Sequence, residues 1–471
     1  MKGNTLLKNT VLLSIGTMFA KGMQFLLVLL VSYWLTTEQY GLFDVLNTYI
    51  TLLLPLLSLA TGEAVFRFCA SVESIEEKAK YITNGLCITS GLLMLCLFVL
   101  FGLGKAGVTG LGMPFALLLV SQLYNYYFQE YVRAIKQLKV YAWNLIISTC
   151  MIIFFSIVLV YGMGLGLQGL LLAHFLGYLA GDFFVVFCTK IWLYLDRKAI
   201  NGRIAKEIVK YSLPLVPNNI SWWILSVSDR QIIHHFMGAA ANGIYAIANK
   251  IPALYSSVYT TFNVSWQQEV VEKMENPDRG VYFNEIYNRV MVFLFTLCSG
   301  ILSVVFLLFS FIFDSRYYEG YLYVPILLTA AIFASQMQFC GGIQIGLKKT
   351  YENGLTTIAG AVINLAVNIT MIRYWGLFAA SVSTLIANWS VAWLRKIRLR
   401  KVVQFKYEKK TWFAAAFYLY FVFAVYICQG NMLFKWLHVA AAAIMFLIFQ
   451  KEFLIRMMAH RGKSERGTKC R

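Results

Sequence analysis

The stretch from Trp222 to Phe236, WWILSVSDRQIIHHF, places an acid and a base side by side in an apolar segment. Asp229 and Arg230 are adjacent there, and Lys250 follows at a similar depth in the next apolar block. Lys21 lies near the middle of the first such block. If these segments cross a membrane, each charge costs several kcal/mol, so it should face a bundle interior or a water-filled cavity.

The charges in these segments favour an anion as the bound species. Lys21, Arg230 and Lys250 against the single carboxylate of Asp229 leave a cationic balance. Arginine and lysine are the side chains that hold phosphate and pyrophosphate groups, and we expect Asp229 to keep Arg230 in place. The alternative is an internal ion pair, for example between Asp229 and Lys250, that only fixes two neighbouring spans together.

The composition identifies the class of protein that must position these residues. The chain has 471 residues, of which 59% are hydrophobic and 13% charged, whereas soluble domains carry about 25% charged residues. The apolar residues form about 14 blocks, each near the roughly 20 residues that cross a bilayer as a helix. We therefore predict an all-α polytopic membrane protein with about 14 transmembrane helices.

The net charge of +19 is mainly a topology signal. When the loops are assigned to alternate sides, about 34 of the 41 Lys and Arg residues fall on the side that holds both termini. The positive-inside rule then places both termini in the cytoplasm and requires an even number of spans. The basic residues thus predict orientation in a cell membrane, and no nucleic-acid partner is expected.

A weak internal repeat divides the chain. TEQYGLFDVLNTY (37–49) resembles AAANGIYAIANKI (239–251), so that Gly41 aligns with Gly243. LKVYAWNL (138–145) resembles KKTYENGL (348–355) at nearly the same offset. Two copies of six spans have the same orientation, which predicts lobes related by a pseudo-twofold along the membrane normal and a substrate route between them.

The repeat sets the predicted domains. They are an N-terminal six-helix lobe at 1–195, a C-terminal six-helix lobe at 196–405, two extra transmembrane helices at 406–455 and a basic cytoplasmic tail at 456–471.

Three further ionisable residues are candidates for a gate or for ion coupling. Glu63 and Arg67 are four residues apart at the end of the second span, which places them on one helix face. They form either a cytoplasmic gate or an interfacial ion pair. Asp182 lies within the sixth span. The sequence leaves two roles open for its side chain, a proton relay or an interhelical hydrogen bond.

Prolines flank the charged stretch. Pro214 and Pro217 precede it, and Pro252 follows Lys250. Proline removes a backbone donor and bends a helix, so these positions predict hinges beside a cavity, or simple packing curvature.

No sequence signal supports an enzyme. The chain contains no nucleotide-binding loop, no hydrolase or metalloprotease motif and no Cys or His spacing typical of a metal site. We therefore expect no catalytic residues, no metal and no cofactor.

The chain resembles a known family in two segments. YSLPLVPNNISWWILSVSDRQIIHHFMGAAANGIYAIANKIPAL (211–254) is similar to the middle signature of Wzx-type oligosaccharide flippases. TTEQYGLFDVLNTYITLLLPLLSLATGEAVFRF (36–68) resembles their first spans. These flippases belong to the MATE-like multidrug/oligosaccharidyl-lipid/polysaccharide exporter superfamily.

The resemblance implies a function that agrees with the predicted anion site. It implies alternating-access transport of oligosaccharide units linked to undecaprenyl pyrophosphate across the cytoplasmic membrane of a bacterium, with Asp229, Arg230 and Lys250 as cavity residues. Surface-polysaccharide polymerase and assembly proteins would be partners, besides membrane lipids. The alternatives are an ion-coupled drug exporter, which should have an acidic cavity, a membrane-embedded glycan polymerase or ligase, and a scaffold that transports nothing.

Overall fold

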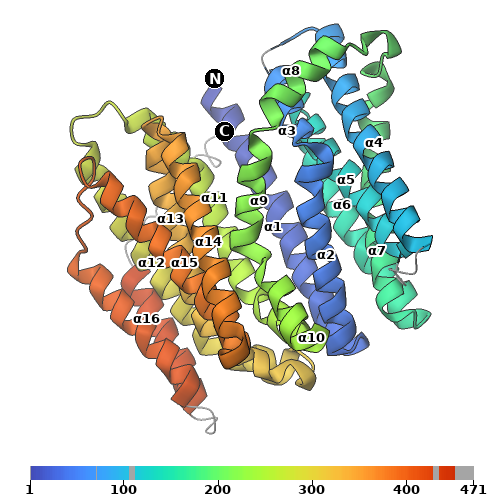
Figure 1. The fold of residues 1–471 in the computed structure, drawn as a ribbon. Helices are drawn as coiled ribbons and strands as arrows, with labels where there is room; N and C mark the ends of the chain where they lie inside the picture. The colour runs from blue at the N-terminus through green and yellow to red at the C-terminus, as the bar shows by residue number, and fades with distance from the viewer. Residues whose placement is uncertain (1, 71, 106–111, 428–433, 451–471) are drawn as a thin grey trace, which may run out of the picture. The chain divides into compact units, whose positions relative to one another are not determined.

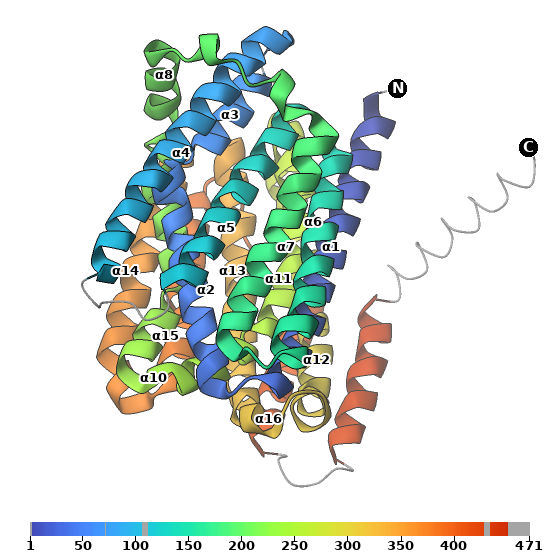
Figure 2. The same ribbon diagram turned by 90° about the vertical axis from the view of Figure 1, so that its right-hand side faces the viewer.

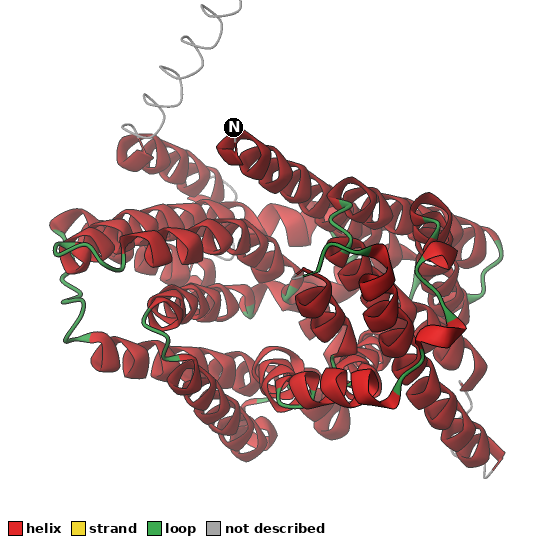
Figure 3. Ribbon diagram, turned by 90° about the horizontal axis from the view of Figure 1, so that it is seen from above, coloured by secondary structure: helices red, strands yellow, loops and turns green. Residues whose placement is uncertain are grey.

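The computed structural model describes residues 2–70, 72–105, 112–427 and 434–450. Every regular element in these ranges is a helix, and most connections are short loops (Figure 3). The prediction of an all-α polytopic membrane protein is therefore confirmed. The predicted tail at 456–471 lies outside the described residues.

Ten helices in the described residues are long and apolar enough to cross a membrane. The other predicted spans coincide with helices that are shorter or more polar, namely α5 (Gly112–Ala134), α9 (Leu215–Val227) with α10 (Asp229–Ala248), α11 (Lys250–Lys273) and a final helix at Phe434–Gln450. The chain is thus a multi-pass membrane protein, and the count of about 14 spans stays a prediction.

The chain divides into two compact units. The first comprises Met1–Ala246 and Asn368–Gly376, and the second comprises Ile247–Val367 and Leu377–Arg471. The units do not coincide with the domains predicted from the repeat, which remain a prediction.

The first unit contains ten α-helices, coloured blue to green in Figure 1. They are α1 (Lys2–Trp34), α2 (Thr37–Ser58), α3 (Thr61–Ala70), α4 (Ile75–Lys105), α5 (Gly112–Ala134), α6 (Leu138–Ser156), α7 (Gly166–Thr189), α8 (Gly202–Ser212), α9 (Leu215–Val227) and α10 (Asp229–Ala248). Within this unit α6 packs against α7, α5 packs against α7, and α1 packs against α6 (Figure 2).

The second predicted span is broken into two helices. α2 starts at a capping box, in which the Thr36 hydroxyl accepts from the Gln39 amide and the Gln39 side chain accepts from the Thr36 amide. It ends where Leu59 and Ala60 adopt left-handed backbone angles, with φ of 47° and 53°. The residues that follow form the separate helix α3.

The prolines mark helix beginnings. Pro214 is the N-cap of α9, Pro217 lies in its first turn, and Pro252 lies in the first turn of α11 (Lys250–Lys273). Proline is tolerated there because the first amides of a helix have no intrahelical acceptor. The sharp turn in this region is at Gly238 inside α10, whose φ of 85° is easily adopted only by glycine.

The second unit contains the remaining helices, yellow to red in Figure 1. They are α11, α12 (Arg279–Leu307), α13 (Val324–Gly346), α14 (Thr350–Trp375), α15 (Leu377–Leu399), α16 (Lys409–Ile427) and the helix Phe434–Gln450. Within this unit α13 packs against α11 and α15, and α12 packs against α16. The last turns of α14, from Asn368, belong to the first unit.

Candidate functional site: a polar seam between α2 and α10

The backbones of α2 and α10 are in direct contact at two glycines. A Cβ atom added to Gly41 would overlap the Ala239 carbonyl oxygen and lie 2.7 Å from the Gly243 amide nitrogen. A Cβ added to Gly243 would overlap the Thr37 carbonyl oxygen and lie 3.2 Å from the Gly41 nitrogen. Only glycine leaves room for this approach, as in the small-residue contacts of other membrane helices.

These contacts are reciprocal in the way that a local twofold requires. Gly41 and Gly243 are the glycines that the internal repeat aligns, and the same alignment pairs Thr37 with Ala239. Gly41 approaches Gly243 and Ala239, and Gly243 approaches Gly41 and Thr37. Ala239 and Thr37 each lie four residues before the glycine of their own helix. An isologous contact of this kind forms where equivalent surfaces meet across a twofold axis.

Arg230 is neutralised at this seam by a residue that sequence reasoning missed. Its Nε lies 2.7 Å from Oδ2 of Asp44 on α2, and the two side chains are only 14% and 8% exposed. The expectation that Asp229 holds Arg230 in place therefore needs correction, because its carboxylate partner is Asp44. The signal was present in the sequence, since a carboxylate inside a span is itself a functional candidate.

Asp229 has its own set of partners. It is 4% exposed and accepts hydrogen bonds from the Tyr245 hydroxyl and from Nδ2 of Asn368, each at 3.0 Å. As the first residue of α10 it also lies at the positive end of the helix dipole. Asp229 thus ties the two arms of α10 to the end of α14.

A row of neutral hydrogen bonds continues the seam on both sides of the ion pair. Asn242 donates to the Gly41 carbonyl at 2.9 Å. Gln231 donates to the Thr48 hydroxyl at 2.5 Å, and the Trp223 indole donates to the Thr48 carbonyl at 3.0 Å. The same face of α2 therefore binds α9 and α10 from Gly41 to Thr48 (Figure 1).

The ionisable groups at the seam include one that the sequence analysis did not select, the carboxylate of Asp44. Asp44 and Asp229 contribute two carboxylates, and Arg230 contributes one guanidinium. Lys21 is exposed on α1, and Lys250 is the half-buried first residue of α11 in the second unit. The prediction that these lysines line a cavity with Arg230 stays a prediction.

Glu63 and Arg67 do not form an ion pair in the described structure. Glu63 accepts hydrogen bonds from the Tyr126 hydroxyl at 3.1 Å and from Nδ2 of Asn219 at 3.0 Å, whereas Arg67 is exposed. The four-residue spacing places both side chains on one face of α3, but the Glu63 carboxylate bonds to side chains of α5 and α9 instead of Arg67. Glu63 therefore links three helices of the first unit.

Asp182 is buried in the interior of the first unit. It is 5% exposed and accepts from Nδ2 of Asn125 at 2.8 Å. The same Nδ2 donates to Oδ1 of Asn144 at 3.2 Å, and Nε2 of Gln129 donates to the side-chain oxygen Oδ1 of Asn125 at 2.7 Å. The interhelical hydrogen bond is thus observed, within a network that joins α5, α6 and α7.

Solved structures with the same architecture define the class of fold. The lipid II flippase MurJ, in an inward closed conformation, is 14% identical with a TM-score of 0.74, covering 95% of this chain and 100% of that one. An inward-facing multidrug resistance MATE family transporter of the MOP superfamily is also 14% identical, with a TM-score of 0.62 over 81% of this chain and 94% of the other. The fold is therefore that of the MurJ and MATE transporters.

The sequence also matches a family directly. The pattern of the family described as "Polysaccharide biosynthesis protein" matches residues 6–267, and the chain belongs to this family. An uncharacterized membrane protein of Methanocaldococcus jannaschii is 22% identical over 419 residues, which are 82% of this chain and 96% of that protein. The resemblance noted in the sequence is thus confirmed as membership of this polysaccharide biosynthesis family, and the fold agrees with it.

The glycine contact makes a prediction about stability. Gly243→Val forces backbones apart, and overpacking of this kind costs about 1–3 kcal/mol. The purified variant should unfold at a lower temperature than the natural chain in a thermal denaturation assay. Gly22→Ala is the matched control, because a Cβ there meets nothing within 4 Å. Equal unfolding temperatures for the valine variant and the natural chain would contradict the close approach.

The ion pair makes a second prediction. Asp44→Ala or Arg230→Ala leaves the other charge largely buried and unpaired, which costs about 3–5 kcal/mol in a buried pair. The double variant should lose less stability than the sum of the two single variants, since neither charge remains. Chemical denaturation of all four proteins measures the coupling. Strictly additive losses would show that the two side chains do not interact.

Proposed function

We propose that this protein flips oligosaccharide repeat units linked to polyprenyl pyrophosphate across the cytoplasmic membrane by alternating access, for surface polysaccharide assembly. The family and the transporter fold support the class of activity. The observation that carries the proposal is the polar seam itself. It joins α2 of the first predicted repeat to α10 at the start of the second, where a transporter of this class has to open and close.

The seam is built from interactions that can separate. The glycine contact requires no interlocked side chains, and most of the bonds along it are neutral hydrogen bonds. Hydrogen bonds between membrane helices contribute on average only about 0.6 kcal/mol each. A row of them therefore gives a specific register without making the closed state irreversible, which suits a transporter that alternates between two conformations.

The Arg230–Asp44 pair suggests how a pyrophosphate head enters the cycle. Arg230 is neutralised by Asp44 in the closed seam, so an anion binds Arg230 only by displacing the Asp44 carboxylate. A pyrophosphate can bind the guanidinium through two parallel hydrogen bonds, as the carboxylate can. In this proposal the substrate head competes with Asp44 for Arg230 and thereby favours the open seam, and Lys250 and Lys21 add positive charge for the same head.

Glu63, Arg67 and Asp182 are proposed to act in gating or energy coupling. Glu63 already links α3, α5 and α9, so loss of its bonds would remove one connection between α9 and its neighbours. Asp182 is a buried carboxyl whose described partner is a neutral amide. A carboxyl in that setting can exchange a proton during a cycle driven by an ion gradient. Pro214, Pro217 and Pro252 are proposed hinges, since they stand where helices begin.

The proposal includes a location. The distribution of Lys and Arg supports insertion in the cytoplasmic membrane of a bacterium with both termini inside the cell. Undecaprenyl pyrophosphate carries the glycan in this proposal, and polymerase and assembly proteins receive it. We assign no catalytic step to the chain.

The opening of the seam is testable by linking it shut. In a chain whose nine native cysteines are replaced, Thr48→Cys and Gln231→Cys can be joined by a short cleavable reagent that links two thiols. Joining them should stop delivery of surface glycan in spheroplasts, and reductive cleavage should restore it, because the seam has to open in every cycle.

The control for this experiment is a pair that should not separate. Ser90 and Tyr124, on α4 and α5, lie 3.0 Å apart through their hydroxyl oxygens. Ser90→Cys with Tyr124→Cys, linked by the same reagent, should leave glycan delivery unchanged. Normal delivery by the linked Thr48 and Gln231 pair would contradict the opening of this seam.

The substrate class is testable in a strain whose surface glycan can be stained. Arg230→Ala and Lys250→Ala should each lower surface polymer at equal membrane abundance, because each removes a charge proposed to meet the pyrophosphate. Normal polymer in both variants would refute the anion site. Unchanged polymer in a strain lacking the protein, together with increased drug sensitivity, would favour the drug exporter instead.

A further inference from the structure

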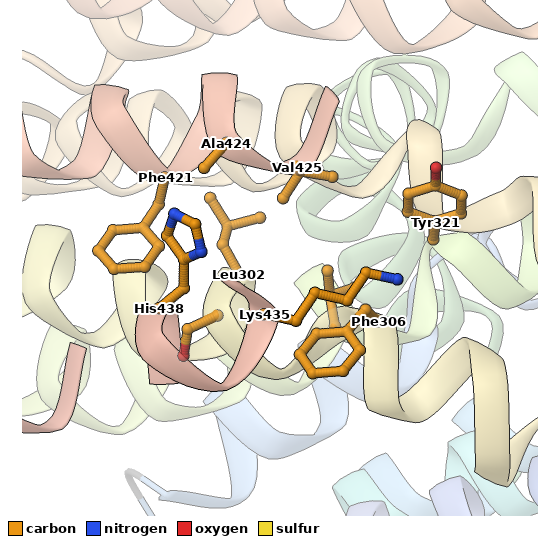
Figure 4. A pocket seen from close by; sticks show the side chains of 10 residues that line it. Leu302, Phe306, Tyr321, Phe421, Ala424, Val425, Lys435 and His438 are labelled. Carbon is orange, nitrogen blue, oxygen red and sulfur yellow. The ribbon is translucent and has the colours of Figure 1, made fainter. Parts of the chain in front are cut away.

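A pocket in the second unit has a chemical character that the proposed transport cycle does not use. It is small and partly open, with space of about 40 Å³ between α12, α16 and the helix Phe434–Gln450 and with Tyr321 at one side (Figure 4). Most of its lining is aliphatic or aromatic, for example Phe306 and Ala424. That space takes a few groups of the size of a methylene or a water molecule, such as a short part of a longer chain.

The pocket contains one lysine side chain, that of Lys435. Its Nζ lies 5.2 Å from the ring centroid of Phe306, so a cation–π contact holds the side chain along the wall. No carboxylate lines the pocket, and no ion pair to Lys435 occurs among the described residues. The site is therefore apolar with a positive end.

His438 connects the two helices that form one side of the pocket. Its Nε2 lies 2.8 Å from the Tyr420 hydroxyl and its Nδ1 lies 2.6 Å from the Phe434 carbonyl oxygen. The ring also packs against Phe421 at 5.9 Å. Because both nitrogens have protein partners, His438 joins the last two helices and leaves Lys435 to meet a ligand.

The outer faces of the same two helices are strongly apolar and exposed. Phe423, Ile427, Trp436 and Leu437 are each more than half exposed. In a membrane-spanning helix such faces contact lipid chains, so bilayer lipids lie next to the pocket.

We propose that this pocket binds an anionic phospholipid of the surrounding bilayer, with part of one acyl chain between α12, α16 and the last helix and the phosphate on Lys435. A lysine next to a lipid phosphate supplies charge complementarity, while the apolar walls take the chain. The bound lipid would fasten the two C-terminal helices to α12. The site is independent of the seam, so it stands or falls separately from the proposed transport.

The experiment is native mass spectrometry of the purified protein with phosphatidylglycerol or phosphatidylcholine. The natural chain should retain one phosphatidylglycerol with about fivefold preference, the ratio expected from one lysine beside an anionic headgroup. Lys435→Gln should abolish the preference. Lys409→Gln, an exposed lysine at the other end of α16, should keep it. Equal retention of both lipids by the natural chain would overturn the proposal.

A second variant tests the place of the acyl chain. Ala424→Phe fills the pocket, so it should lose retained phosphatidylglycerol and the rise in unfolding temperature that this lipid gives the natural chain. Retention of the lipid by folded Ala424→Phe would show that it binds elsewhere. Displacement of phosphatidylglycerol by equimolar undecaprenyl phosphate would assign the pocket to the glycan carrier and overturn the proposal as well.

Discussion

A charge inside a membrane helix has to be neutralised within the protein, and the Arg230–Asp44 pair meets this requirement where α2 and α10 touch. The pair fixes which faces of the two helices meet. It also accounts for the position of the neutral bonds around it, since Asn242 and Gln231 donate to α2 one turn to either side. Removal of either charge would leave the other in surroundings with little water, so this pair is the costliest contact of the seam to break.

The glycines explain why the pair can form at all. Gly41 and Gly243 let two backbones approach closely, which brings the short side chain of Asp44 within reach of Arg230. Their reciprocal contact also shows how a weak sequence repeat becomes a structural feature. The predicted twofold relation between the two copies would bring equivalent residues into contact at its axis, and the contact between Gly41 and Gly243 has this form. Sequence similarity in this region therefore reflects a packing constraint.

The charges of the first unit give the proposed cycle a specific form. In the proposed cycle, a pyrophosphate binds Arg230 only when the Asp44 carboxylate is released. Asp182, a buried carboxyl whose described partner is a neutral amide, is proposed to change its charge during the cycle. Competition at one site and protonation at another are two separate means of shifting a population between conformations.

The sequence by itself determined the class of fold, since blocks of apolar residues can satisfy their backbone groups in a bilayer only as helices. It also identified the paired glycines, and it marked Asp229, Arg230, Glu63 and Asp182 as unusual, because charge in such blocks is costly. Only the tertiary structure decided their partners. Arg230 lies beside Asp229 in sequence yet pairs with Asp44, and Glu63 bonds to Tyr126 and Asn219 instead of Arg67. Spacing along a helix specifies which residues share a face, whereas the identity of the facing helix depends on packing between segments far apart in the chain.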